Sequence, residues 1–175
     1  MRKTILVTAA VATLSLGLAA PAFADTTGGT GASFALTGGP LSITVPTAAT
    51  LSTQATGATS LITGSLGTVA VTDARGLLGA VWTASAASTA FTTGAAGPAE
   101  TIANTAVTYT PGATTAPTGG TFTAGPGGAM GDSQTAYSET GDGNNSASWN
   151  PTISVAVPTQ AVVGTYDATI THSVA

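Results

Sequence analysis

Few side chains in this 175-residue sequence can do chemistry, and the most distinctive of them lie in the run 71–82, VTDARGLLGAVW. Arg75 is the only basic residue beyond position 3, and it follows the acid Asp73 by two positions. Aspartate at the first position and glycine (Gly76) at the fourth are typical of a type I turn. The carboxylate of Asp73 can accept backbone N–H groups in such a turn and can also pair with Arg75. Turn chemistry explains this pattern without a ligand, so we favour a capped turn that ends a strand. The functional alternative is that Arg75 presents its guanidinium to a polar partner.

The chain has one histidine, His172, and no cysteine. His172 shares the apolar face of an alternating segment with Tyr166 and Ile170, which favours packing or hydrogen bonding over the role of a base. One histidine among many serines identifies no catalytic triad, and a chain without cysteine forms neither disulfides nor thiolate metal sites. We therefore expect no catalytic residue, no cofactor and no enzymatic activity.

A third group of polar residues is rich in oxygen atoms. It comprises Asp132, Glu139, Asp142, Asn144 and Asn145. Loops with many oxygen ligands can bind Ca²⁺, but this spacing does not match an EF-hand loop. Acids in turns are usually solvated, so we favour that interpretation and predict no metal site.

The elements that must position these residues are strands, because short segments with period-two alternation recur along the chain. They are Leu41–Val45, Thr68–Thr72, Ile153–Val157 and Thr165–Val174. Clusters of Gly, Pro and Thr separate them, and threonine itself favours strands. We predict an all-β fold: an antiparallel β-sandwich, Ig-like in general style. The segments SITVPTAA (42–49) and SVAVPTQA (154–161) resemble each other, and we favour two strands that end alike over an internal duplication.

Other stretches read as turns, loops or core. We interpret Pro111–Asp132 as a loop with Phe122 as its inward anchor, and Glu139–Ser146 as a turn rich in Gly and Asn. We interpret the Ala-rich stretch Ala84–Ala90 as the end of a strand followed by a loop. Both tryptophans favour the core, with an exposed platform for a sugar ring as the alternative for Trp149.

The N-terminus has the features of a cleavable secretory signal peptide over residues 1–24. Arg2 and Lys3 precede an apolar stretch, and Ala22 and Ala24 are the small residues that a signal peptidase reads. The apolar stretch is too short for a good membrane anchor, so we expect no membrane span after cleavage. Residues 25–32 then form a flexible lead-in, and residues 33–175 form a single sandwich domain.

Cleavage leaves one basic residue against seven acids, a net charge of −6. Binding to nucleic acid or to anionic lipid requires clustered Lys and Arg, which excludes nucleic acid as a partner. Hydrophobic residues make up 43% of the chain, and their periodic arrangement indicates folding rather than disorder.

Two segments resemble the motifs of WxL domains, which occur on the surface proteins of Gram-positive bacteria. The run 71–82 resembles the first motif through Asp73, Arg75, Gly76, Gly79 and Trp82. The tail GTYDATITHSV (164–174) is similar to the second motif, Tyr-x-x-Thr-(Leu/Ile)-Thr-Trp-x-Leu. The matching residues there are Tyr166, Thr169, Ile170 and Thr171. The chain departs from the family at Ala84 and Val174, where the family has Leu, and at His172, where it has Trp.

This resemblance implies a secreted, extracellular, wall-associated domain that binds peptidoglycan or another cell-wall glycan non-covalently. The residues expected to bind or to shape the binding face are Asp73, Arg75, Gly76, Trp82, Tyr166, Thr169, Thr171 and His172. A second hypothesis is a structural subunit that docks to other surface proteins or self-assembles through sheet edges, because its strands lack the Lys and Pro residues that protect edges. A secreted hydrolase is a third, which the shortage of acid and base groups disfavours.

Overall fold

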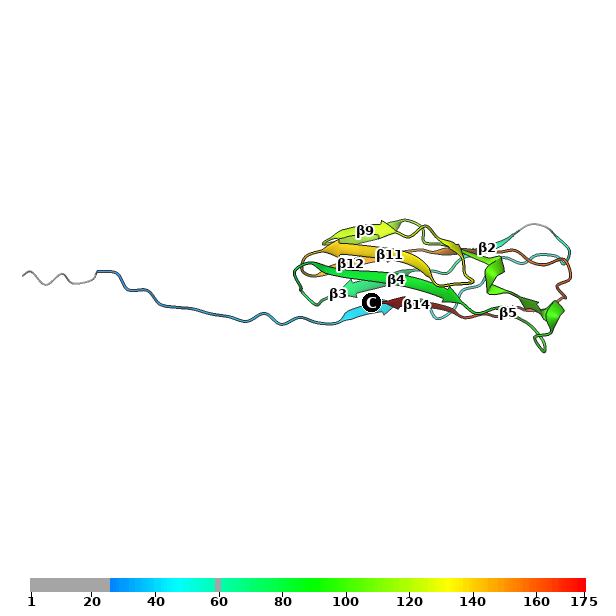
Figure 1. Cartoon of the computed structure of the whole chain (residues 1–175), viewed down its shortest axis with the longest axis horizontal. Coiled ribbons are helices and arrows are strands. Elements are labelled where there is room, and N and C mark those ends of the chain that lie inside the picture. The colour runs from blue at the N-terminus through cyan, green and yellow to red at the C-terminus, as the bar shows by residue number, and fades with distance from the viewer. Residues whose placement is uncertain (1–25, 59–60) are drawn as a thin grey trace, which may run out of the picture. The chain divides into compact units, whose positions relative to one another are not determined.

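The computed structural model describes residues 26–58 and 61–175. The chain divides after Ala35 into two units, of which Leu36–Ala175 contains all of the described strands (Figure 1). The predicted signal peptide lies outside the described residues. The described part of the predicted lead-in, from residue 26 onward, contains neither helix nor strand.

The sandwich unit is built almost entirely of strands. In chain order these are β1 (Leu41–Thr44), β2 (Ile62–Ser65), β3 (Val69–Asp73), β4 (Ala80–Ser88), β5 (Phe91–Thr92), β6 (Thr101–Ile102), β7 (Val107–Thr110), β8 (Thr114–Thr118), β9 (Thr121–Ala124), β10 (Gly128–Ala129), β11 (Gln134–Gly141), β12 (Asn145–Trp149), β13 (Thr152–Val155) and β14 (Ile170–Val174). Two short 3₁₀ helices, η1 (Pro98–Glu100) and η2 (Asn104–Ala106), connect some of them. No helix among the described residues has the length and apolar character needed to cross a membrane.

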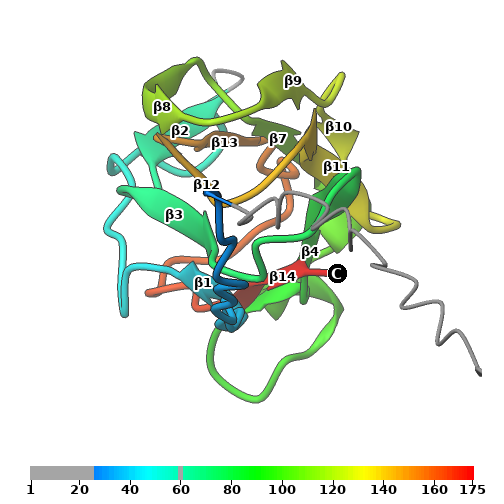
Figure 2. The ribbon, with the colours of Figure 1, turned by 90° about the vertical axis from the view of Figure 1, so that its left-hand side faces the viewer.

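Two antiparallel layers form a β-sandwich, which confirms the predicted fold class (Figure 2). One layer is the sheet β14-β4-β11-β9. The other consists of two sheets placed end to end, β1-β3-β12-β8 and β2-β13-β7-β10. Each of the pairs β2 and β3, β12 and β13, and β7 and β8 is separated by only two or three residues. The second layer is therefore one long sheet that bends in the middle.

The bend arises where three neighbouring strands lose their pairing. Pro151, which has no N–H to donate, separates β12 from β13, and Gly112 separates β7 from β8 with φ at +78°. A Cβ atom at Gly112 would lie 2.7 Å from the carbonyl oxygen of Asn150. Thr68 Oγ1 donates to Asn150 Oδ1 over 2.8 Å, and Tyr137 of the facing layer donates its hydroxyl to the Gly112 carbonyl over 2.5 Å. The Tyr137 hydroxyl thus satisfies one backbone carbonyl at the bend, and the Leu66 amide donates to the Pro151 carbonyl over 2.9 Å.

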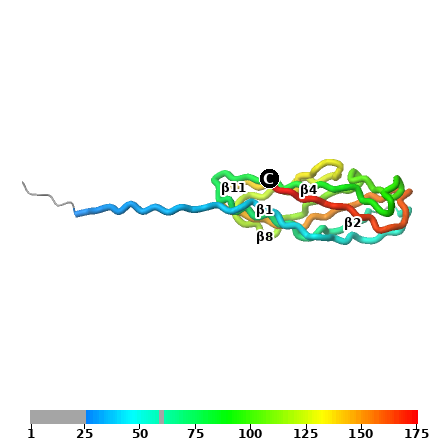
Figure 3. The backbone as a smooth tube through the Cα atoms, turned by 90° about the horizontal axis from the view of Figure 1, so that it is seen from below, coloured from blue at the N-terminus to red at the C-terminus, as the bar shows by residue number. Residues whose placement is uncertain are grey.

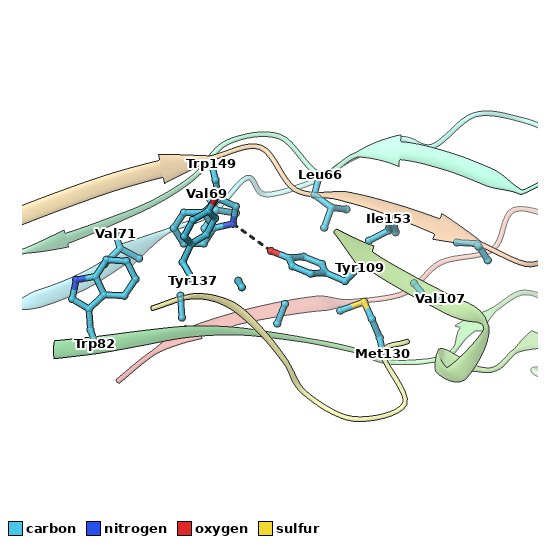
Figure 4. Close-up of a cluster of buried hydrophobic side chains, with 14 of the residues drawn as sticks. Leu66, Val69, Val71, Trp82, Val107, Tyr109, Met130, Tyr137, Trp149 and Ile153 are labelled. Carbon is cyan, nitrogen blue, oxygen red and sulfur yellow. Dashed lines mark hydrogen bonds between the residues drawn. The ribbon is translucent and has the colours of Figure 1, made fainter. Parts of the chain in front are cut away.

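Large aromatic side chains fill the space between the layers (Figure 4). Trp82 and Trp149 are 1% and 0% exposed, which places both in the core and excludes the sugar platform considered for Trp149. The Trp149 ring packs against Tyr137 with centroids 4.8 Å apart, and its Nε1–H donates to the hydroxyl of Tyr109 over 3.3 Å. The Trp82 ring lies 5.9 Å from that of Phe122, the residue predicted as an inward anchor.

The prediction of a loop over Pro111–Asp132 is wrong, because this segment contains β8, β9 and β10. Its glycines mark the turns between strands: Gly119 and Gly120, at φ +56° and +113°, let the chain cross from one layer to the other. The Ala-rich stretch 84–90 is mostly strand, since β4 continues to Ser88. The turn predicted within Glu139–Ser146 is present between β11 and β12, although the strands flanking it are longer than expected.

Candidate functional site

The turn that follows β3 is organised by one buried carboxylate. Asp73 is fully buried, and its Oδ1 accepts the backbone N–H of Arg75 over 2.9 Å. Its two oxygens also accept Nε and Nη2 of the Arg75 guanidinium over 2.9 and 2.7 Å, and Nη2 donates further to the Val81 carbonyl over 3.0 Å. This paired geometry lowers the pKa of Asp73 and raises that of Arg75. Gly76 continues the turn with φ at +64°, a conformation that favours glycine.

Two further polar side chains are buried behind this pair. Asn145 lies opposite Asp73 in the register of β12 with β3, and its Oδ1 accepts the indole N–H of Trp82 over 2.8 Å. Glu139 of β11 lies opposite Trp82 and is 1% exposed. Burial, and secondarily the negative charge of Asp73, raise the pKa of Glu139. Neither carboxylate oxygen of Glu139 nor Nδ2 of Asn145 has a hydrogen-bond partner among the described residues.

We call this region the Arg75 end, defined by Asp73, Arg75, Trp82, Glu139 and Asn145. Its outer surface combines one cation with exposed apolar side chains. The Arg75 side chain is 29% exposed, while Leu77, Leu78 and Val81 are 52%, 89% and 58% exposed. The three hydrogen bonds of the guanidinium use Nε and Nη2, which leaves the two N–H groups of Nη1 for an outside acceptor.

The residues of the second motif lie on and before β14, where most of them have structural partners. Tyr166 donates its hydroxyl to the carbonyls of Ala99 and Val162 over 3.1 and 3.0 Å. The Thr169 amide donates to the hydroxyl of Thr89 over 3.0 Å. Thr171 is exposed and points outward from β14.

His172 belongs to a buried hydrogen-bonded chain. Its Nε2 lies 3.1 Å from the Tyr109 hydroxyl, which already accepts the indole N–H of Trp149. Which of the two groups donates depends on the tautomer of the imidazole, and burial lowers the pKa of His172, which favours the neutral ring. Burial also raises the pKa of Tyr109 to about 12. An imidazole held in this way links the two layers through Tyr109 of β7.

The two motifs do not converge on one site. His172 pairs with Ala86 of β4, four residues along the strand from Trp82. This separation corresponds to about 13 Å along a strand. Asp73, Arg75, Gly76 and Trp82 lie together at the Arg75 end, whereas Tyr166, Thr169 and His172 border a different part of the sandwich.

The acids considered for Ca²⁺, Asp132, Glu139 and Asp142, do not form one cluster in the part of the chain that the structure describes. Glu139 is buried, and Oδ1 of Asp142 accepts the amide N–H of Gly79 over 2.5 Å. The described residues contain no group of three or more His, Cys, Asp or Glu side chains placed to hold a metal ion. Asp142 instead ties the turn before β12 to the turn before β4.

A groove, which sequence reasoning missed, runs along the open side of the sandwich, and we call it the apolar groove because its larger cavity is mainly apolar. Two adjoining cavities of about 200 and 680 Å³ share Ala49, Leu51, Phe91 and Ala168 in their walls. They are lined by the segment that follows β1 and the segment that precedes β14. Figure 3 draws these two segments in cyan and in orange to red. Buried Ile102 and Val155 also line the larger cavity, together with exposed Val162 and Val163.

Comparison of the chain with protein-family models, with curated proteins and with solved structures finds no match. The resemblance to WxL domains therefore stays a prediction that rests on the two motif segments.

Proposed function

We propose that this chain is a secreted, non-enzymatic cell-surface protein that associates non-covalently with the peptidoglycan of the cell wall through the Arg75 end. One observation carries the proposal: a partly exposed guanidinium is held in place by a buried carboxylate and is flanked by exposed apolar side chains. Such a fixed guanidinium suits the carboxylates of stem peptides and the oxygens of glycans. Exposed Leu77, Leu78 and Val81 add apolar contact for the same ligand.

The surroundings of the titratable groups support a non-enzymatic role. Asp73 is committed to its ion pair, Glu139 is buried, and His172 is bonded to Tyr109. A general acid or base must reach the substrate within hydrogen-bond distance. None of these three groups is both exposed and free of its partner, which disfavours each of them as the acid or base of a wall hydrolase.

The test is sedimentation of residues 25–175 with protein-free peptidoglycan. Replacing Arg75 alone would leave Asp73 buried and unpaired, so the variant to use is Asp73→Asn with Arg75→Ala, which keeps a side-chain acceptor for the amide of residue 75. We expect this variant and Leu77→Asp/Leu78→Asp to sediment less than the wild-type chain. The charge-matched control is Val162→Asp/Val163→Asp, which should sediment as the wild type does.

Three results would overturn wall binding. They are a wild-type chain that stays in solution, binding that is equal in all variants, and release of wall fragments by the purified protein. Sedimentation that requires an added protein fraction would favour the second candidate function, a subunit that docks to other surface proteins or to itself. One feature supports that candidate: β1 and β14 lie close to each other but are not paired, so each leaves one sheet edge without a partner strand.

A further inference from the structure

The chain carries two large apolar side chains just before the sandwich begins. Phe34 and Leu36 are 88% and 89% exposed, and they alternate with Ala35 and Thr37 as in a strand with one apolar face. All residues from 26 to 40 are exposed, and none of them is charged. We call residues 33–37 the arm. An uncharged, alternating segment without regular secondary structure suits addition to a sheet edge or groove.

The apolar groove offers the complementary surface. Its larger cavity, about 680 Å³, has room for more than one large side chain and is lined by Phe91, Ile102 and Val155, among others. The titratable side chains lining the two cavities are Tyr166, Asp167 and His172, and burial favours the neutral form of His172 by lowering its pKa. An uncharged apolar segment therefore meets no cluster of charge in the groove.

The free edge of β14 runs beside the groove. Ala175 and Thr83 exchange two backbone hydrogen bonds, so Thr171 and Ser173, at alternate positions, also face β4. The N–H and C=O groups of Ile170, His172 and Val174 consequently point away from β4. β1 lies close beside β14, whereas Ile170 and His172 line the smaller cavity, so the beginning of β14 is the part of this edge that adjoins the groove.

The connection to the arm and the groove lie at opposite ends of the sandwich unit. The Gly39 amide donates to the Ala74 carbonyl over 2.6 Å, so the chain enters β1 beside the Arg75 end. β1 then leads away from that end, since its residues pair with β3 in the order Asp73 to Ala70. The larger cavity includes Ile62, at the end of β2 farthest from β3.

We propose that the arm of one copy fills the apolar groove of a second copy, with Phe34 and Leu36 as the side chains that enter. Because the arm and the groove are different surfaces, each contact between two copies is heterologous and leaves one free arm and one free groove for further copies. Phe34 lies five residues before Gly39, whose amide is hydrogen-bonded to the sandwich, so it extends up to about 17 Å from that point toward an adjacent copy. The inference is independent of wall binding and gives the second candidate function its two surfaces.

Three charge-matched variants of residues 25–175 test the proposal by sedimentation velocity over a range of concentrations. They are Phe34→Asp/Leu36→Asp in the arm, Val162→Asp/Val163→Asp at the groove, and Leu77→Asp/Leu78→Asp at the Arg75 end as the control. We expect the wild type and the control to grow in mass with concentration, and the arm and groove variants to stay monomeric. An equimolar mixture of the arm and groove variants should form a 1:1 complex, because one retains only the groove and the other only the arm.

The proposal is overturned if the wild type is monomeric at every soluble concentration. An arm that occupies the groove of its own chain would give this result. Assembly of the arm variant at the wild-type level overturns it as well. So does a small apolar molecule that native mass spectrometry finds bound equally to the wild type and the arm variant. Wall binding is tested independently of assembly, because a monomeric arm variant with an intact Arg75 end should still sediment with bare peptidoglycan.

Discussion

The Arg75 end and the groove end are made of the same two layers, but they close in different ways. At the Arg75 end the aromatic ring of Trp82 and the polar groups of Asp73, Glu139 and Asn145 fill the space between the layers. At the groove end apolar side chains such as Phe91 line cavities that remain open. The bend at Gly112 and Pro151 lies between the two.

This difference shows which end contributes to stability and which is available to a partner. Substitutions in a filled and hydrogen-bonded interior destabilise the protein, so the residues there contribute mainly to the stability of the fold. An open apolar surface contributes less to folding and leaves apolar area to be buried by association. The four predictions that follow compare the two ends, beginning with the largest expected effect.

Trp82→Ala should reduce the free energy of unfolding by about 3–5 kcal/mol, because it empties the space beside Phe122. Trp82→Phe should cost less, about 1–3 kcal/mol, because it leaves Asn145 Oδ1 buried without its donor. Urea unfolding of residues 25–175 measures both. A Trp82→Ala chain as stable as the wild type would contradict the core position of this tryptophan.

Glu139→Gln should stabilise the protein at neutral pH by about 1–3 kcal/mol, because it removes a buried carboxylate without a hydrogen-bond partner near Asp73. Folding raises the pKa of Glu139, so the stability that its protonated form contributes is present below about pH 4.3 and is lost as pH rises through the folded-state pKa. The difference between variant and wild type should therefore shrink on acidification toward pH 4. Thermal unfolding across this range checks it, and an unchanged difference would contradict the assignment.

His172→Gln should have the opposite pH signature. Folding lowers the pKa of His172, so the stability of the neutral form is complete above about pH 6.5 and is lost as pH falls through that value toward the folded-state pKa. The slope from one group is at most about 1.4 kcal/mol per pH unit. The unfolding free energy of the variant should depend less on pH below pH 6.5 in the same unfolding measurement. If the unfolding free energy of the variant falls as steeply with decreasing pH as that of the wild type, groups other than His172 cause the loss of stability in acid.

Val162→Asp/Val163→Asp should change the unfolding free energy least, by within about 0.5 kcal/mol per site, because Val163 is 86% exposed and Val162 is 42% exposed. Chemical denaturation at a concentration where the protein is monomeric provides the measurement. A large loss would show that the rim of the groove is part of the folding core, which would end the contrast between the two ends.

Much of the fold follows from local patterns. Alternation over Leu41–Val45 and Ile153–Val157 predicted β1 and β13, and the Asp-Gly-Asn sequence predicted the turn before β12. The same alternation applied to Tyr137 and Glu139 places both on one face, which could have identified Glu139 as buried. Asn145 likewise alternates with buried Ala147 and Trp149. The prediction for Pro111–Asp132 failed because glycine and proline at strand ends resemble those of a continuous loop.

The sequence by itself determined the class of fold and the partnership of Asp73 with Arg75, because a two-residue spacing and a strand period are local properties of the chain. Only the tertiary structure decided that the two motifs separate, that His172 bonds to Tyr109, and that the open side of the sandwich forms an apolar groove. These outcomes depend on which strands become neighbours and where the long layer bends. Pairing between residues far apart in the chain is governed by the packing of the two layers, which no local spacing encodes.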